Sequence, residues 1–226
     1  MTGLAPRASR LGYDLIVFDW DGTLMDSTGV IAASLQEACR DVGIAVPHLR
    51  EAKFVIGLGL ADTLRHVAPG LDEQAQRRLA ERYRHHFLAR ENEMPLYEGV
   101  REMLDDLRAR GSRLAVATGK ARRGLQRVLE LTGLGPHFEA TRCADEGFAK
   151  PHPDMLLMLL EITGVEPRRA LMVGDTTHDL ELAANAGIEA VAVSYGAHPE
   201  DLLATRPALA RCASVAELRR WLAAHA

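Results

Sequence analysis

Lysine is scarce in this sequence, although basic residues as a class are not. Of the 27 lysine and arginine residues, only Lys53, Lys120 and Lys150 are lysines. The compact ammonium of lysine and the planar guanidinium of arginine differ in shape and hydration, so an ammonium is hard to replace where a phosphate must be held closely. The three lysines are therefore the first cations to consider for a specific role.

Cysteine and long apolar runs are also scarce. Cys39, Cys143 and Cys212 are odd in number and form no CxxC pair, which favours neither a disulfide framework nor a zinc site. Such usage is typical of a reducing compartment, so a cytoplasmic location is expected. No run of about 18 apolar residues predicts a membrane span, and the polar residues 1–12 do not resemble a signal peptide. A net charge of −4 provides no basic field for nucleic acid or a membrane surface.

Strand-like and helix-like segments alternate along most of the chain. Short apolar, β-branched runs predict strands at 15–18, 113–118, 138–142, 169–173 and 190–194. Amphipathic patterns between them predict helices at 99–110, 121–131, 154–163 and 178–185, with a last helix capped by Ser214. This alternation is typical of βαβ units. We therefore expect an α/β fold in which a Rossmann-like parallel sheet lies between two layers of helices.

One segment interrupts this alternation directly after the first strand. Residues 28–95 contain helical patterns, the first capped by Ser27 and another by Asp72, but no convincing strand. We predict an inserted α-helical cap domain at 28–95 and a core made of 1–27 and 96–226. At 226 residues the chain is long enough for such a core and a smaller insert.

The first predicted strand ends at two carboxylates, Asp19 and Asp21. Alternate residues of an extended segment point the same way, so both side chains can face one spot. They would repel each other unless a cation lay between them, and hard oxygen ligands suit Mg²⁺. The alternative is an acidic turn, because Asp-Gly sequences such as Asp21-Gly22 are common in turns.

Other polar groups follow the remaining strands at the same edge of the sheet, where ligands of open parallel sheets bind. These groups are Thr118-Gly119-Lys120, Lys150-Pro151, and Gly174-Asp175 with Asp179. The set fits phosphoryl transfer: a metal and a lysine neutralise phosphate charge, a hydroxyl and N–H groups hold its oxygens, and carboxylates attack or carry a proton.

Each of these residues also has a simpler explanation. Lys150 could be a solvated loop lysine, Thr118 a β-branched strand residue, and Asp175 and Asp179 a helix cap and a helix-surface residue. For Lys120 the choice between the site and solvent stays open.

The four groups stand in the order of four family motifs. The segments Asp19-Trp20-Asp21-Gly22-Thr23, Thr118, Lys150-Pro-His-Pro-Asp154 and Gly174–Asp179 resemble those of the haloacid dehalogenase superfamily of phosphatases, in the branch with a helical cap after the first strand. The resemblance covers nearly the whole chain. It implies a Mg²⁺-dependent phosphomonoesterase that acts on a small phosphorylated metabolite.

The resemblance also implies a role for each motif residue. Asp19 would be the nucleophile that forms an aspartyl-phosphate, and Asp21 would protonate the leaving oxygen and then activate water. Thr118 and Lys150 would bind the phosphoryl oxygens. Asp19, the main-chain carbonyl of Asp21, and Asp175 would hold Mg²⁺. Asp179 would orient Lys150 or a metal-bound water.

Asp21 selects the branch of the superfamily, because the dehalogenase and phosphonatase branches lack an acid at this position. The chain looks most similar to phosphoglycolate phosphatases, which suggests Gly57, Leu58, Gly59 and Gly119 as further substrate-binding positions. Trp20 and Gly119, the latter in place of the commoner Asn, depart from that pattern. A sugar phosphomutase resembling β-phosphoglucomutase and a non-catalytic binding protein on the same fold remain alternatives. A monomer or homodimer without nucleic-acid or membrane partners is expected.

Overall fold

A computed structural model describes residues 12–226, and residues 1–11, on which the signal-peptide prediction falls, lie outside the described part. Within it, six parallel strands form one sheet in the order β3-β2-β1-β4-β5-β6. The strands are β1 (Leu15–Phe18), β2 (Arg113–Thr118), β3 (Ala140–Cys143), β4 (Ala170–Gly174), β5 (Glu189–Val193) and β6 (Ala210–Cys212). The predicted parallel sheet is confirmed.

Strand β1 lies in the middle of this sheet and ends earliest. Its last residue, Phe18, is level with Val116 of β2 and Val173 of β4. Both neighbours continue past that level, to Thr118 and Gly174. The residues directly after β1 therefore lie between the ends of two longer strands, which places Asp19 at the centre of the carboxyl edge.

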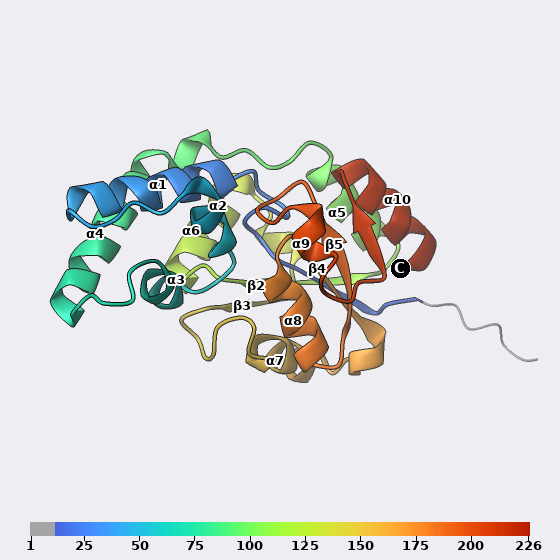
Figure 1. Cartoon of the computed structure of the whole chain (residues 1–226). Coiled ribbons are helices and arrows are strands. Elements are labelled where there is room, and N and C mark those ends of the chain that lie inside the picture. The colour runs from blue at the N-terminus through green and yellow to red at the C-terminus, as the bar shows by residue number, and fades with distance from the viewer. Residues whose placement is uncertain (1–11) are drawn as a thin grey trace, which may run out of the picture.

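Helices pack on both faces of the sheet, as Figure 1 shows. The helices are α1 (Thr28–Asp41), α2 (Leu49–Phe54), α3 (Leu60–Val67), α4 (Glu73–Ala89), α5 (Val100–Ala109), α6 (Arg122–Thr132), α7 (Asp154–Thr163), α8 (Thr177–Asn185), α9 (Glu200–Leu203) and α10 (Val215–His225), with 3-10 turns η1 (Glu91–Glu93), η2 (Gly135–His137) and η3 (Pro167–Arg169). Ile16 and Phe18 join the apolar cluster that includes residues of α5, α6 and α10. Leu15 and Val17 join the cluster that includes residues of α7 and α8. Alternate residues of one strand thus serve two cores, which gives three α/β/α layers.

Helices α1 to α4 form a cap with an apolar cluster of its own. Leu35, Leu64 and Leu79, which lie on three different cap helices, are buried in this cluster. Figure 1 shows these helices gathered to one side of the sheet, apart from the layers that cover its faces. The predicted helical cap, inserted after the first strand, is present.

Several local predictions need correction. Ser27 precedes α1, but its side chain makes no capping hydrogen bond. Helix α2 was not predicted, because its cap is His48, whose side chain accepts a hydrogen bond from the amide of Arg50, whereas Ser, Thr, Asp and Asn are the usual N-caps. The four-residue α9 and the three-residue edge strand β6 are too short for a periodic signal. Strand β3 begins at Ala140, two residues later than predicted.

The predictions made from the few cysteines and from the lack of long apolar runs can be compared with the structure. Cys39, Cys143 and Cys212 are all buried free thiols, as expected of a chain without a disulfide framework. Among the helices of residues 12–226, none is both long and apolar enough to cross a membrane.

Candidate active site

The centre of the carboxyl edge is an enclosed ion cluster. The ammonium of Lys150 lies 2.6 Å from Asp19 Oδ1 and 2.6 Å from Asp179 Oδ1. All three side chains are buried, with exposed fractions of 0 or 1%. A charge at that depth needs compensating partners, and Lys150 has one carboxylate on each side. Lys150 is thus not a solvated loop lysine, and the fold brings together three motif residues that are far apart in sequence.

Asp179 holds Lys150 and also stabilises the start of α8. Its Oδ2 accepts hydrogen bonds from the amide and the hydroxyl of Thr176, at 3.0 and 2.7 Å. The hydroxyl of Thr176 in turn accepts from the amide of Asp179, so the two residues form a capping box. The N-cap of α8 is therefore Thr176 and not Asp175. Both oxygens of Asp179 are engaged, which fixes the carboxylate that faces Lys150.

Asp175 is fully buried beside this cluster and is held by two donors. Its Oδ1 accepts a hydrogen bond from the Thr23 hydroxyl at 2.9 Å, and its Oδ2 accepts one from the amide of Ala197 at 2.7 Å. Gly22, with φ of +83°, lies directly against the carboxylate. A Cβ at this position would collide with Asp175, so the turn after Asp21 requires glycine for both its conformation and its close approach.

Three of these carboxylates could hold a cation. One oxygen each of Asp19, Asp175 and Asp179 lies within 4.8 Å of the others. Asp19 Oδ2 is buried and has no hydrogen-bond partner among the described residues. A buried carboxylate oxygen left unpaired is costly unless a cation or a bound group meets it. An all-oxygen donor set with one oxygen unsatisfied fits a hard divalent cation such as Mg²⁺.

The pKa values of the clustered side chains also indicate a site for a cation. Burial is the largest cause of a rise in the pKa of Asp19; Lys150 opposes that rise, the charges of Asp179 and Asp21 add to it, and the net pKa is about 7. Burial, together with the charges of Asp19 and Asp179, also raises the pKa of Asp175 well above its ordinary value. For Lys150, burial alone would lower the pKa, but the two neighbouring carboxylates outweigh it and raise the pKa. The site thus has an excess of negative charge that a divalent cation would offset.

Asp21 has a different set of partners from Asp19. Its Oδ1 accepts a hydrogen bond from the Ser27 hydroxyl at 2.6 Å and lies 3.0 Å from the ammonium of Lys120. Sequence reasoning missed Ser27, which was expected to cap a helix, and left Lys120 open. The scarcity of lysine was a usable signal for Lys120, because two of the three lysines, Lys120 and Lys150, pair with carboxylates of the first motif.

The side chain of Trp20 points away from these carboxylates. It is fully buried in the apolar core. Its indole N–H donates to Met25 Sδ at 3.4 Å, and its ring meets Phe138 edge-on at 6.2 Å. The departure from the family pattern at Trp20 therefore concerns core packing rather than substrate contact.

The predicted cap loop touches the core next to Thr118. A Cβ on Gly119 would lie 2.5 Å from the carbonyl oxygen of Gly57 and 2.6 Å from that of Leu58. Such distances exclude any larger side chain unless the backbone moves. Thr118 itself is buried, and its hydroxyl accepts from the amide of Lys120 at 3.2 Å. Glycine in place of the commoner asparagine thus lets the cap loop rest directly on the loop after β2.

A second contact between cap and core was not predicted. The main-chain oxygen of Phe54 in α2 lies 2.8 Å from His178 Nε2 and 2.9 Å from His198 Nε2. The ring of Phe54 stacks on His198 at 5.2 Å with an interplanar angle of 6°. His198 Nδ1 accepts from the amide of Thr177, so its Nε2 carries the proton given to Phe54. Burial lowers the pKa of both histidines, which favours their neutral form.

Comparison with known proteins identifies the family. Residues 16–193 match the model of the haloacid dehalogenase-like hydrolase family. The chain belongs to this family.

Relatives of this haloacid dehalogenase-like chain carry several names. Tyrosine-protein kinase PtkA of Mycobacterium tuberculosis is 37% identical over 222 residues, which cover 96% of this chain and 75% of the relative. The probable phosphatase IndB of Dickeya dadantii is 34% identical, covering 84% of each chain. A phosphoglycolate phosphatase of Aquifex aeolicus is 32% identical, covering 80% of this chain and 85% of its own. The crystal structure of a predicted phosphatase from Clostridium acetobutylicum superposes with a TM-score of 0.83 at 26% identity, covering 94% of this chain and 99% of that one.

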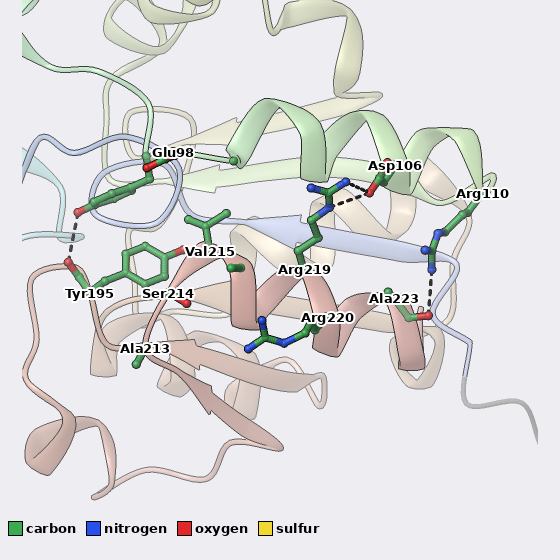
Figure 2. Close-up of a pocket in the computed structure, with 13 residues that line it drawn as sticks. Glu98, Asp106, Arg110, Tyr195, Ala213, Ser214, Val215, Arg219, Arg220 and Ala223 are labelled. Atoms are coloured by element: carbon green, nitrogen blue, oxygen red, sulfur yellow. Dashed lines mark hydrogen bonds and ion pairs between the residues drawn. The ribbon is translucent and has the colours of Figure 1, made fainter.

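A large cavity of this haloacid dehalogenase-like protein lies away from the cluster, between α5 and α10. It has a volume of about 830 Å³, and Figure 2 shows its lining residues. Arg219 donates to Asp106 and Arg110 donates to the carbonyl of Ala223, so both cations already have partners (Figure 2). The cavity contains none of the predicted site residues.

Proposed function

We propose that the protein is a Mg²⁺-dependent phosphomonoesterase that acts through an aspartyl-phosphate. The observation that carries the proposal is the state of Asp19. One of its oxygens is held by Lys150, and the other is buried without a hydrogen-bond partner in the described part of the chain. A carboxylate that is fixed at the end of the central strand and keeps one free oxygen is suited to nucleophilic attack.

In the first step, a carboxylate oxygen of Asp19 attacks the phosphorus, and the bond from phosphorus to the ester oxygen breaks. Asp21 gives its proton to the departing oxygen, so the leaving group departs as an alcohol. Lys150 and Thr118 hold the oxygens of the transferred phosphoryl group. When bound, a divalent cation held by Asp19, the main-chain carbonyl of Asp21, and Asp175 would neutralise phosphate charge.

In the second step, water attacks the phosphorus of the aspartyl-phosphate. Asp21 takes a proton from that water, the bond between phosphorus and the Asp19 oxygen breaks, and inorganic phosphate leaves. The hydrogen bond from Ser27 and the ion pair with Lys120 both reach Asp21 Oδ1. Oδ2 is therefore the oxygen that we assign to proton transfer in both steps.

The physiological substrate proposed is a small phosphorylated metabolite such as 2-phosphoglycolate. The 32% identity to a phosphoglycolate phosphatase of Aquifex aeolicus supports this choice. So does the close seating of the cap loop on Gly119, which leaves little room for a bulky group there. With Mg²⁺, kcat/KM for 2-phosphoglycolate is expected to exceed that for p-nitrophenyl phosphate. Equal values would leave only a generic phosphatase.

The assignment of Asp19 is tested by Asp19→Asn. We expect this variant to fold and to release no phosphate from either substrate. Asp201→Asn, the same change at an exposed position of α9, is the matched control and should keep full turnover. Normal turnover of p-nitrophenyl phosphate by Asp19→Asn would remove the nucleophile from the mechanism.

Protein-tyrosine phosphorylation is the second candidate function, and the 37% identity to tyrosine-protein kinase PtkA favours it. The two functions leave different chemical traces. After incubation with γ-labelled ATP, a kinase would leave label on tyrosine, which is stable to hydroxylamine. The proposed phosphatase would transfer no label from ATP to tyrosine. Given a labelled phosphomonoester, it would carry label only on Asp19, which hydroxylamine removes, and would release free phosphate.

A sugar phosphomutase is separated from both by its product. A mutase returns the phosphoryl group to a sugar phosphate, so a burst of free phosphate from a simple ester argues against it. A non-catalytic binding protein would release no phosphate from any ester.

A further inference from the structure

The side chain of Lys120 lies between the proposed general acid and the cap. It is only 8% exposed, and its ammonium is 3.0 Å from Asp21 Oδ1. The same ammonium lies 4.9 Å from the centre of the Phe87 ring, on cap helix α4. Among the ion pairs of residues 12–226, Asp21 is the one carboxylate that meets Lys120. One cation therefore links the acid of the core to an aromatic surface of the cap.

The surface of α4 that faces this cation is aromatic rather than charged. Tyr83 lies one turn before Phe87, and the two rings stack at 5.9 Å. Burial raises the pKa of Tyr83, and the charge of Asp21 adds to the rise. Helix α4 thus presents two stacked aromatic rings on this side, and Lys120, beside Phe87, is the cation that a ligand can meet there.

The leaving group of a substrate must lie in this space. In the proposed mechanism Asp21 gives a proton to the ester oxygen, so the carbon attached to that oxygen lies beside Asp21. Lys120 pairs with the same carboxyl group and is therefore within reach of substituents on that carbon. A nearly buried ammonium beside an aromatic ring is unfavourable unless an anionic or hydrogen-bonding group pairs with it.

We propose that Lys120 is a specificity-determining residue that selects substrates whose leaving group carries an anion close to the ester oxygen. A carboxylate one carbon away is the simplest such group. This inference rests on the proposed phosphatase function. Without substrate, Lys120 pairs with Asp21. A substrate carboxylate takes over the ammonium, and Asp21 then faces the leaving oxygen with Ser27 as its remaining donor.

The test compares two substrates that differ only in this anion. They are 2-phosphoglycolate and ethyl phosphate, each assayed by phosphate release with Mg²⁺. The wild-type protein should favour 2-phosphoglycolate by at least about tenfold in kcat/KM, since a hydrogen bond between charged groups contributes roughly 1.5–3 kcal/mol. In Lys120→Met the ratio of the two kcat/KM values should fall by about 10- to 100-fold. Lys53→Met, the same change on the cap helix α2, is the matched control and should keep the wild-type ratio.

A merely structural role of Lys120 predicts a different result. If Lys120 only positions Asp21, its loss lowers kcat/KM for both substrates by the same factor, and the ratio does not move. An unchanged ratio, or a wild-type protein without preference, overturns the proposal. Lys120→Gln, which keeps a polar group, repeats the test should the Met variant fail to fold. If the wild-type protein releases no phosphate from any ester, the proposed function falls and takes this inference with it.

Discussion

Removing the charge of Asp19 should make the protein more stable while making it inactive. The carboxylate is fully buried next to Asp179 and Asp21, and burial raises its pKa from the ordinary 3.8 to about 7. Above pH 7 the Asp19 carboxylate is therefore ionised in the folded protein, although its buried surroundings favour the neutral form, and this lowers the stability of the fold. Asparagine has nearly the same shape and no charge, so Asp19→Asn removes this cost.

The magnitude and the sign follow from the shift in pKa. A rise of about 3 units corresponds to about 4 kcal/mol, which is fully expressed above pH 7. The folded-state pKa lies above the unfolded one, so the contribution of Asp19 to stability is lost as pH rises from about 4 to about 7. Asp19→Asn should therefore unfold like the wild-type protein at pH 4. At pH 8 it should be more stable by up to about 4 kcal/mol, or on the order of 10 °C in Tm.

Thermal unfolding in EDTA at pH 4, 6 and 8 measures this difference. Asp201→Asn, on the exposed side of α9, is the control and should follow the wild-type curve. Adding Mg²⁺ at pH 8 should raise the Tm of the wild-type protein and narrow its gap to Asp19→Asn, because the cation offsets the buried charge. A gap that is the same at pH 4 and pH 8, or a less stable Asp19→Asn at pH 8, would refute the reasoning.

Three further predictions concern the metal, the contact between the cap and Gly119, and the buried ammonium of Lys150. EDTA should abolish phosphate release and Mg²⁺ should restore it; full activity in EDTA contradicts the metal site. Gly119→Ala pushes a Cβ against the carbonyls of Gly57 and Leu58, so unfolding should become easier by about 1–3 kcal/mol and kcat/KM should fall. The control is Gly124→Ala in α6, where nothing lies within 4 Å of the new Cβ. This variant should instead raise the free energy of unfolding by about 0.5–1 kcal/mol. Lys150→Met leaves two buried carboxylates without their cation, so urea unfolding should show a loss of about 3–5 kcal/mol; an unchanged midpoint contradicts the buried pairing.

The architecture could be predicted because its signals are local. Apolar β-branched runs gave the bounds of β1 and β2 to the residue, and α7 likewise begins and ends where its apolar pattern does. The parallel sheet then orders the strand ends at one edge. That rule is enough to place Asp19, Lys150 and Asp175 near one another without any structure.

The partners of individual side chains could not be predicted in the same way. Ser27 stands where a helix cap is expected, and only the fold of the turn after β1 directs its hydroxyl to Asp21 instead. The carbonyl of Phe54 meets two histidines that are more than 120 positions away in the sequence. Such contacts depend on how the cap sits on the core, which no short pattern encodes.

Asp179 bonds both to Lys150 and to the first turn of α8. The order of that turn therefore indicates whether the Lys150 cluster is correctly formed. The oxygen that caps the helix and the oxygen that holds Lys150 belong to one rigid carboxylate. When that turn frays, the ammonium loses its orientation in the same event. Amide hydrogen exchange at Thr176, whose N–H donates to Asp179, would therefore report how often the ammonium of Lys150 loses its alignment.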